Sequence, residues 1–228
     1  MVLRAGDMST AEAARRAMQQ LCETYWYPLY AYVRRHGSDP QDAEDLTQGF
    51  FTHLVASAAV ATVRPEKGRF RAFLLASIKN YLHNDRRTKN TLRRGGRLHC
   101  LPIHNLACEK RYQSQLSIDD TPDRQFERDW AEALLQRVVT RLREDYSAAG
   151  RLDLFEVLHP FLVASGDQLP KAEIANRFGM SLAAVKMSVH RMRKQYAGRV
   201  REEIAATLES PDDVEDELRK IIVLVRHG

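Results

Sequence analysis

Apolar residues recur at steps of three and four along most of this 228-residue chain, and no stretch alternates with the period of two typical of a half-buried β-strand. This spacing predicts helices over residues 40–55 and 70–87, a long helix from Pro122 behind an N-cap at Thr121, and a short one over 154–162. The first helix has the apolar stripe Met18, Leu21, Cys22, Tyr25, Leu29, Tyr32 and Val33. The sequence therefore predicts an all-α fold.

The ends of the first two helices carry their own signals. Pro28 lies inside the first apolar stripe and should kink or interrupt that helix. Gly37 ends the segment, and Ser38 with Gln41 three residues later is typical of a capping box at the start of the next helix.

The periodicity fades between Thr88 and Asp120, where glycines and basic residues indicate a linker. We expect two helical domains joined by that linker, plus a C-terminal helix. The C-terminal segment begins with a good cap at Ser210 and carries an acidic face, so we expect it to pack on the second domain or to mask that domain by mimicking DNA. The predicted boundaries are a first domain over 8–90, a basic linker over 91–121, a second domain over 122–207 and an acidic amphipathic helix over 208–228.

Composition narrows the class of protein. No apolar run is long enough to cross a bilayer, the N-terminus lacks the apolar core of a secretory signal, and the 3 cysteines are too few for a disulfide scaffold. These features predict a soluble protein of the cytoplasm with no membrane insertion. The net charge of +5 favours a polyanionic partner.

The segment from Lys171 to Lys194 carries the sharpest functional pattern. Ala175, Gly179 four residues later and Val185 six further on have the spacing of a helix-turn-helix, with Ser181 as the cap of its second helix. Leu182, Val185, Val189 and Met192 are expected to face inward. The outward residues would then lie in the major groove of DNA, and they are Lys186, Met187, His190, Arg191 and Lys194. An ordinary helical hairpin with a solvated basic face is the alternative.

Two helices of the first half also have polar faces. The helix over 70–87 presents Lys79, Asn80, His83, Arg86 and Arg87, in which an amide suits a base edge and the cations suit phosphates, although a solvated face is the alternative. Phe70 and Tyr81 on the same helix are interpreted as core residues. The helix over 40–55 carries early carboxylates that suit the helix dipole, and Asp45, Gln48 and an exposed Phe51 form a candidate stripe for a partner protein.

The sequence contains few features of a catalytic or metal-binding site. Asp42, Glu44 and Asp45 could serve a nucleic-acid hydrolase, but no nucleophile, metal cluster or phosphate loop accompanies them, so we expect no enzyme, no catalytic residue and no cofactor. Cys100, His104 and Cys108, with His99 beside them, are zinc-ligand types at a spacing that lacks a CxxC pair. We expect no metal site there.

Two motifs in order resemble one family. DAEDLTQGFFTHL followed by FRAFLLASIKNYLHNDRR resembles the second conserved region of bacterial RNA polymerase sigma factors of the sigma-70 family. AEIANRFGMSLAAVKMSVHRMRK resembles their fourth region, and the short linker between is similar to the extracytoplasmic-function (ECF) group. The resemblance covers roughly residues 21–87 and 126–204.

This resemblance implies a non-enzymatic protein that binds core RNA polymerase and promoter DNA and directs transcription initiation, with room for an anti-sigma partner. The residues that match the helix docking on the polymerase clamp are Asp42, Asp45, Gln48 and Phe51. The candidates for melted minus-ten DNA, around the matching loop and helix, are Arg69, Arg71, Lys79, Asn80, Arg86 and Arg87. The residues implied to read the minus-thirty-five element are the outward set of the second motif, Lys186, Met187, His190 and Arg191, with Lys194 beside them.

The chain departs from the family pattern in three places. The approach over 146–170 is longer than usual, residues 210–228 are additional, and Met187 and His190 are uncommon reading residues, so no promoter sequence transfers. The rival function is a helix-turn-helix repressor or activator, which needs no polymerase-docking helix and usually dimerises on a palindrome.

Overall fold

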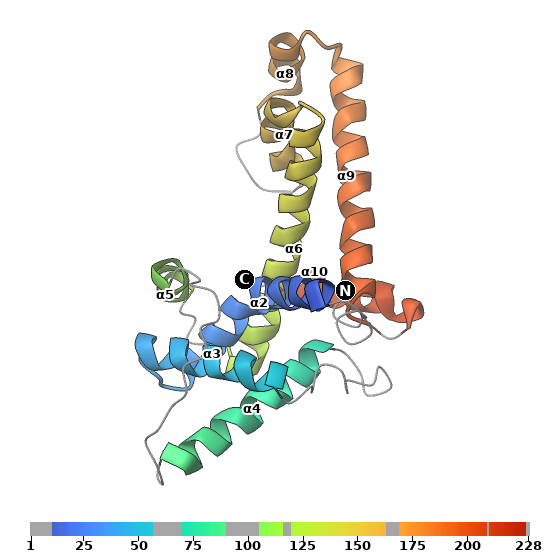
Figure 1. Cartoon of the computed structure of the whole chain (residues 1–228). Coiled ribbons are helices and arrows are strands. Elements are labelled where there is room, and N and C mark those ends of the chain that lie inside the picture. The colour runs from blue at the N-terminus through green and yellow to red at the C-terminus, as the bar shows by residue number, and fades with distance from the viewer. Residues whose placement is uncertain are drawn as a thin grey trace. The chain divides into compact units, whose positions relative to one another are not determined.

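A computed structural model of the protein describes residues 11–56, 70–89, 105–115, 120–162, 169–208 and 210–226. Those residues form helices and turns and contain no strand, which confirms the all-α prediction (Figure 1). Among them, none of the helices is both long and apolar enough to cross a membrane. The chain divides into two compact units, and the division differs from the predicted domains: one unit joins Met1–Ala133 to Ala205–Gly228, and the other is Leu134–Ile204.

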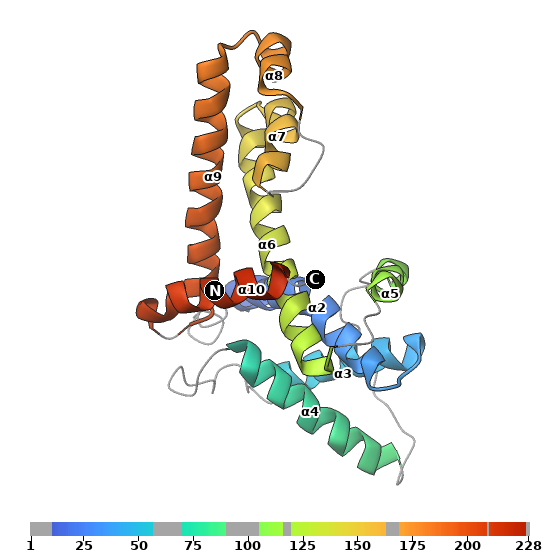
Figure 2. The same ribbon diagram turned by 180° about the vertical axis from the view of Figure 1, so that it is seen from behind.

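The first unit is assembled from both ends of the chain. Within it α2 contacts both α3 and α5, and α3 contacts α4. Figures 1 and 2 show these helices from opposite sides. The unit contains α2 (Ala11–Arg35), α3 (Pro40–Ala56), α4 (Phe70–Lys89), α5 (Asn105–Ser114), the beginning of α6 (Pro122–Ala148), the 3-10 turn η3 (Pro211–Asp213) and α10 (Val214–Arg226).

The junction of α2 and α3 corrects two local predictions. Helix α2 continues through Pro28, so of the predicted kink or interruption the interruption does not occur. The buried residues on either side hold the helix by packing, which offsets the cost of the proline. Gly37 has φ +89° and lies in the turn after α2, as expected. Asp39, rather than Ser38, caps α3, because its Oδ1 accepts the Asp42 backbone N–H at 2.8 Å.

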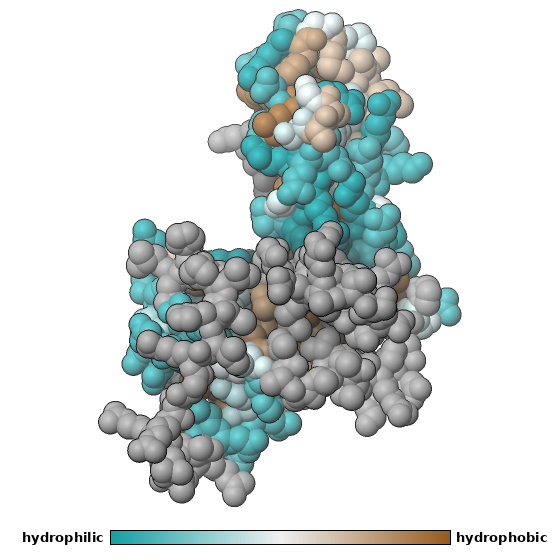
Figure 3. Space-filling view, viewed as in Figure 1, coloured by the Kyte–Doolittle hydropathy of each residue, from teal (hydrophilic) through white to brown (hydrophobic). Residues whose placement is uncertain are grey.

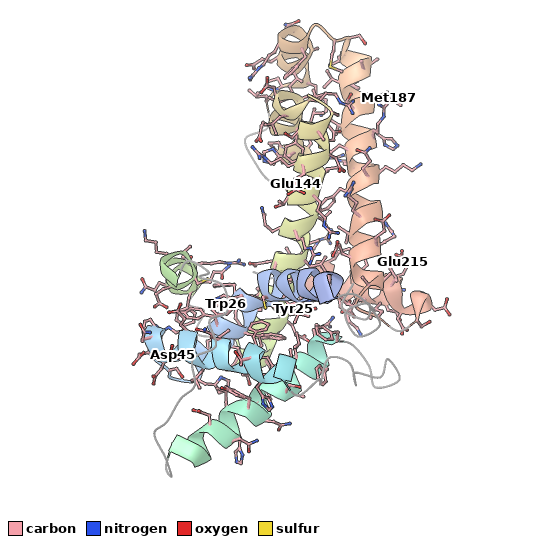
Figure 4. All side chains as sticks on the ribbon, in the orientation of Figure 1. Tyr25, Trp26, Asp45, Glu144, Met187 and Glu215 are labelled. Carbon is pink, nitrogen blue, oxygen red and sulfur yellow. The ribbon has the colours of Figure 1, made fainter. Side chains whose placement is uncertain are left out.

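Aromatic side chains tie the helices of the first unit together. The Tyr25 ring meets Phe70 of α4 edge-on at 5.5 Å, and the Trp26 ring stacks on Phe51 of α3 at 5.8 Å. Trp130 of α6 is buried, and its Nε1 donates to Tyr25 Oη at 3.0 Å. Both polar tips of that pair are thus satisfied inside the core. Figure 4 labels Tyr25 and Trp26 on α2.

Part of the predicted linker is an ordered helix packed on α2. The Glu109 carboxylate of α5 accepts hydrogen bonds from Arg34 Nη2 at 2.8 Å and from Tyr30 Oη at 2.6 Å. The Tyr112 ring is buried, with the Arg34 guanidinium 4.8 Å from its centre. These contacts are made by charged and aromatic groups, so they leave no apolar periodicity in the sequence.

The C-terminal helix α10 belongs to the first unit, together with the beginning of α6, which the sequence placed in the second domain. Its cap is as expected, since the Asp212 backbone N–H donates to Ser210 Oγ at 3.2 Å. Val214, Glu217 and Ile221 are its buried residues. The Glu217 carboxylate pairs with Arg71 of α4 in the same unit.

The second unit consists of the rest of α6, α7 (Leu152–Leu158), the 3-10 turn η2 (His159–Leu162), α8 (Lys171–Phe178) and α9 (Leu182–Ala205) up to Ile204. Its core is one apolar cluster to which all three α-helices and η2 contribute alongside α6. The members are Leu142, Tyr146, Phe155, Val157, Leu158, Phe161, Ile174, Ala175, Val185, Val189 and Met192. Pro160 lies in η2, where a 3-10 turn replaces the end of the predicted short helix.

Candidate functional site

Helix α3 exposes an acidic face. Asp42 and Asp45 are exposed and Gln48 is half-buried, and Figure 4 labels Asp45 on α3. Pro40 starts the helix, so Asp42 lies in its first turn, where the partial positive charge of the helix end favours a carboxylate. Burial, together with the neighbouring charge of Asp45, raises the pKa of the Glu44 carboxyl. The acidic face, defined here as Asp42, Asp45 and Gln48, therefore presents negative charge and an amide to solvent.

Phe51 does not belong to that face. Its side chain is 0% exposed and stacks on Trp26 with the two rings 5° from parallel. The expectation of an exposed Phe51 is therefore wrong. Phe50 on the same helix is also fully buried, so α3 buries two adjacent phenylalanines because α2 covers one side and α4 meets another.

Helix α4 presents a second polar surface. Lys79, Asn80 and His83 are exposed on it, and Lys79 Nζ lies 2.5 Å from Asp123 Oδ2 of α6. Both members of that ion pair are about half exposed, so water screens it and the lysine remains available to other anions. Arg86 and Arg87 lie in the last turns of α4, but their side chains, like all of Arg69, lie outside the described residues.

The packing of α3 on α4 behind this surface is close. The Tyr81 ring of α4 meets Phe50 at 5.7 Å, nearly perpendicular to it. A Cβ added at Gly49 would collide with the Tyr81 hydroxyl, so the absence of a side chain at Gly49 allows the tyrosine to approach. Phe70 is 2% exposed, which confirms its interpretation as a core residue, while Tyr81 is half-buried.

Arg71 is buried, unlike the exposed Lys79 and Asn80 on the same helix. Only 4% of the residue is exposed, and its Nη1 pairs with the Glu217 carboxylate of α10. Its Nε lies 3.4 Å from Glu127 Oε1, and its guanidinium carbon lies 4.6 Å from the centre of the Trp130 ring. In this conformation almost all of Arg71 is covered, in contrast to the sequence expectation of a DNA contact.

The turn between α8 and α9 has the predicted local chemistry. Gly179 has φ 61° and ψ 30°, the left-handed conformation that glycine adopts at least cost, and the Met180 N–H donates to Ala175 O at 2.9 Å. Ser181 caps α9, since its Oγ accepts the Ala184 N–H at 3.1 Å. Three residues therefore suffice to reverse the chain between the two helices.

Helix α9 has a buried and an exposed face, largely as predicted. Val185, Val189 and Met192 are buried, but Leu182 is 45% exposed, so its expected inward position is wrong; it lies in the first turn, at the edge of the core. Figure 3 shows paler, less hydrophilic colour where α9 begins and hydrophilic colour farther along it. The exposed set that we call the α9 outer face is Lys186, Met187, His190, Arg191 and Lys194.

A polar hollow continues this face toward the end of α9. It has a volume of about 440 Å³ and is lined by Arg191, Lys194, Gln195, Gly198, Arg199 and Glu202. Arg199 also pairs with Asp145 of α6. Sequence reasoning stopped at Lys194 and missed Arg199, although Arg199 is eight residues after Arg191 and therefore lies near the same side of a helix.

The candidate zinc ligands cannot be assembled from the structure. Residues 99, 100 and 104 lie outside the described residues, and Cys108 is a half-buried thiol of α5 whose pKa is raised by burial. Within the described ranges, no group of three or more His, Cys, Asp or Glu side chains is placed to hold a metal ion.

Comparison with known proteins gives one family match, and it falls within the first unit. Residues 21–91, about a third of the chain, match the family model of sigma-70 region 2. No curated protein and no solved structure gives a significant match. The matched range contains all of α3 and α4 and most of α2, so it includes the acidic face and the polar surface of α4. Residues 21–91 are thus similar to sigma-70 region 2.

Proposed function

We propose that this protein is a sigma factor of the ECF group that binds core RNA polymerase and directs it to a subset of promoters. The observation that carries the proposal is the family match over α2, α3 and α4, the helices that expose the acidic face. The protein performs no covalent chemistry in this function, because the polymerase makes the RNA, and it acts in the cytoplasm, where the chromosome and the polymerase are.

In this proposal the acidic face of α3 binds the clamp coiled coil of the polymerase large subunit. Asp45 is the best-placed anchor, because its side chain is exposed, whereas Phe51 on the same helix is fully buried. Phe51 then supports the docking helix from behind through its stack on Trp26. Polar side chains on a rigid helix give register to such an interface.

Melted minus-ten DNA would meet the polar surface of α4. Asn80 offers both a donor and an acceptor to an exposed base edge, while Lys79 can exchange its partly exposed partner Asp123 for a phosphate. Arg86 and Arg87 continue the same helix. Arg69 and Arg71 complete the proposed set at its beginning.

The second unit would read the minus-thirty-five element. Helices α8 and α9, joined at Gly179, would act as a helix-turn-helix with the α9 outer face in the major groove. Lys186 and Met187 near the beginning of α9 would face base edges, and Arg191 and Lys194 would face phosphates. The polar hollow lined by Arg191, Lys194 and Arg199 would extend the contact with phosphates.

The decisive experiment is binding of the full chain to purified bacterial core RNA polymerase. We expect Asp45→Arg to abolish binding, because it reverses the charge of the acidic face. Glu144→Arg is the matched control: it makes the same charge change at an exposed position of α6 and should leave binding intact (Figure 4). Absence of polymerase binding by the unchanged chain, together with tight binding to duplex DNA, would favour the repressor alternative.

The DNA-binding part of the proposal has a separate test. Duplexes selected from random sequence by the polymerase complex provide the promoter, and affinity is then measured across a salt series. We expect Arg191→Ala to weaken binding and to reduce the slope of log affinity against log salt by about one unit, as loss of one phosphate contact does. Arg143→Ala in α6, which pairs with Glu156, serves as the control and should leave the slope unchanged.

A further inference from the structure

A guanidinium and a carboxylate are buried together where α10 meets the first unit. Arg71 is 4% exposed and Glu217 is 0% exposed, and the carboxylate pairs with Arg71 Nη1. The guanidinium also lies over the Trp130 ring and near Glu127. Removing two charges from water carries a large solvation cost, so an apolar pair would stabilise the same junction at least as well. Stability alone therefore does not explain why this junction contains an ion pair rather than two apolar side chains.

The cation of this pair is part of the proposed nucleic-acid surface. Arg71 is the second residue of α4, the helix that exposes Lys79 and Asn80, and it lies within the region 2 match. Glu217, in contrast, comes from the C-terminal helix, outside the match, together with the exposed carboxylates of Glu215 and Asp216. The structure thus brings an acidic helix to a cation that a nucleic acid would be expected to use.

Arginine binds a carboxylate and a phosphate in the same way. Its planar donors form parallel hydrogen bonds to two oxygens of either anion, so one can replace the other at the same guanidinium. Trp130 holds the guanidinium plane from behind, which leaves its edge for the anion. A hollow of about 580 Å³ opens beside the pair, lined by Arg71, Glu127, Asp216, Arg219, Lys220, Val223 and Leu224. Space next to Arg71 is therefore already open on one side.

The attachment of α10 is compatible with release. Val214 and Ile221 are the apolar side chains that α10 buries fully, and Leu218 and Leu224 are half-buried, while Ile222 and Val223 are 41% and 52% exposed. Hydrophobic stabilisation scales with the apolar area removed from water, so a helix that fully buries two apolar side chains is held less firmly than α2 with its buried aromatics.

We propose that the Glu217 carboxylate occupies at Arg71 the position of a nucleic-acid phosphate, so that docking of α10 and binding of the DNA backbone exclude each other. Release of α10 then exposes Arg71 at the beginning of α4, and the docked helix holds the free protein in a state of low DNA affinity. The inference rests on the proposed function, because Arg71 is a DNA contact only in a chain that binds melted DNA.

The test measures binding of fluorescent oligo(dT) to the full chain by anisotropy, since a phosphate contact does not depend on base sequence. Glu217→Gln keeps the size of the side chain and removes its charge. We expect it to bind oligo(dT) about tenfold more tightly, because the apparent affinity rises with the fraction of chains in the competent state. Glu215→Gln removes the same charge from an exposed position of α10 and should change affinity less than twofold.

A second variant guards against misfolding. Ile221→Ala loosens α10 without changing any charge, and it should also strengthen oligo(dT) binding, while circular dichroism reports whether the unit remains folded. If Glu217→Gln and Ile221→Ala both bind no more tightly than Glu215→Gln, or if both unfold the first unit, the pair is structural and the proposal is overturned. Binding of core RNA polymerase by the unchanged chain is measured in parallel. Its absence would reject the sigma-factor function, whereas competition at Arg71 is judged by the oligo(dT) series alone.

Discussion

Glu109 and Arg34 form a two-point ion pair between α5 and α2. Arg34 Nη2 lies 2.8 Å from Glu109 Oε1, and Arg34 Nε donates to the other oxygen at 2.9 Å. Both side chains are 17% exposed, so solvent screens the pair less than it screens a surface ion pair. A helix in the segment between the predicted domains is in this way fixed to the α2 surface by a charge-assisted contact.

Replacing Glu109 with glutamine should release α5. The substitution removes the charge that Arg34 and Tyr30 both bind, so we expect local opening of α5 to become easier by about 1–3 kcal/mol. Hydrogen exchange of the α5 amides measures this opening. Lys110→Gln, at an exposed position of the same helix, is the control. Equal exchange rates in both variants would show that other contacts hold α5.

The same pair predicts a pH dependence. Hydrogen bonds from Arg34 hold the pKa of Glu109 at about 2, well below its ordinary value of 4.5. Because the folded-state pKa is lower than the unfolded one, the stabilisation is complete above pH 4.5 and is lost as the pH falls toward about 2. Denaturant unfolding across this range should show a smaller loss of stability in Glu109→Gln than in the unchanged chain. Parallel pH profiles would contradict the assignment.

The close packing of Gly49 against Tyr81 gives a rescue experiment. Gly49→Ala places a methyl group against the Tyr81 hydroxyl, and overpacking of this kind costs about 1–3 kcal/mol of unfolding free energy. Tyr81→Phe removes the oxygen involved, so the double variant should recover most of the loss. Thermal unfolding of the four chains completes the cycle. If Gly49→Ala alone is harmless, α3 and α4 are packed less closely than described.

Two glycines of the second unit should respond to alanine in opposite directions. Gly179 adopts φ 61°, where a Cβ is strained, so Gly179→Ala should lower the free energy of unfolding by about 1–2 kcal/mol. Gly198 lies inside α9 with open space around an added Cβ, so Gly198→Ala should raise stability by about 0.5–1 kcal/mol. Denaturant titration of both variants checks the signs. Equal shifts in one direction would contradict the turn geometry.

Phe51 and Met187 separate a core role from a surface role. Phe51 is fully buried, so Phe51→Ala should destabilise the first unit by about 3–5 kcal/mol. Met187 is 58% exposed, so Met187→Ala should change stability by no more than about 0.5 kcal/mol. In the proposed function Met187→Ala weakens binding to the selected promoter duplex instead. A stable Phe51→Ala chain that loses only polymerase binding would restore Phe51 to the docking surface.

Local sequence patterns predicted most of the helices and several caps. Thr121 caps α6 through a 3.3 Å hydrogen bond from the Arg124 N–H, Ser181 caps α9, and Gly179 has the left-handed backbone expected of it. These features depend on neighbours within four residues, so the pattern contains all the information that determines them. The inward residues Val185, Val189 and Met192 were predictable for the same reason.

The errors concern contacts between distant segments. The apolar spacing of α3 did not indicate that Phe51 is buried, because Trp26, which stacks on it, comes from another helix. Helix α5 packs through Glu109 and Tyr112, which have no apolar repeat. The burial of Arg71 depends on Glu217, which reaches it from the far end of the chain. The roles of the acidic face, of α4 and of the α9 outer face as binding surfaces stay predictions.

The composition of the first unit from both ends of the chain also sets an order of events during synthesis. A ribosome makes Arg71 long before it makes Glu217, because α10 is the last described helix of the chain. The earlier part of the unit, Met1–Ala133, leaves the ribosome while its final helix is still unmade. Until then Arg71 lacks the Glu217 carboxylate, with which it is paired and buried in the finished protein. A nascent chain therefore passes through a stage with a different surface charge from that of the finished protein.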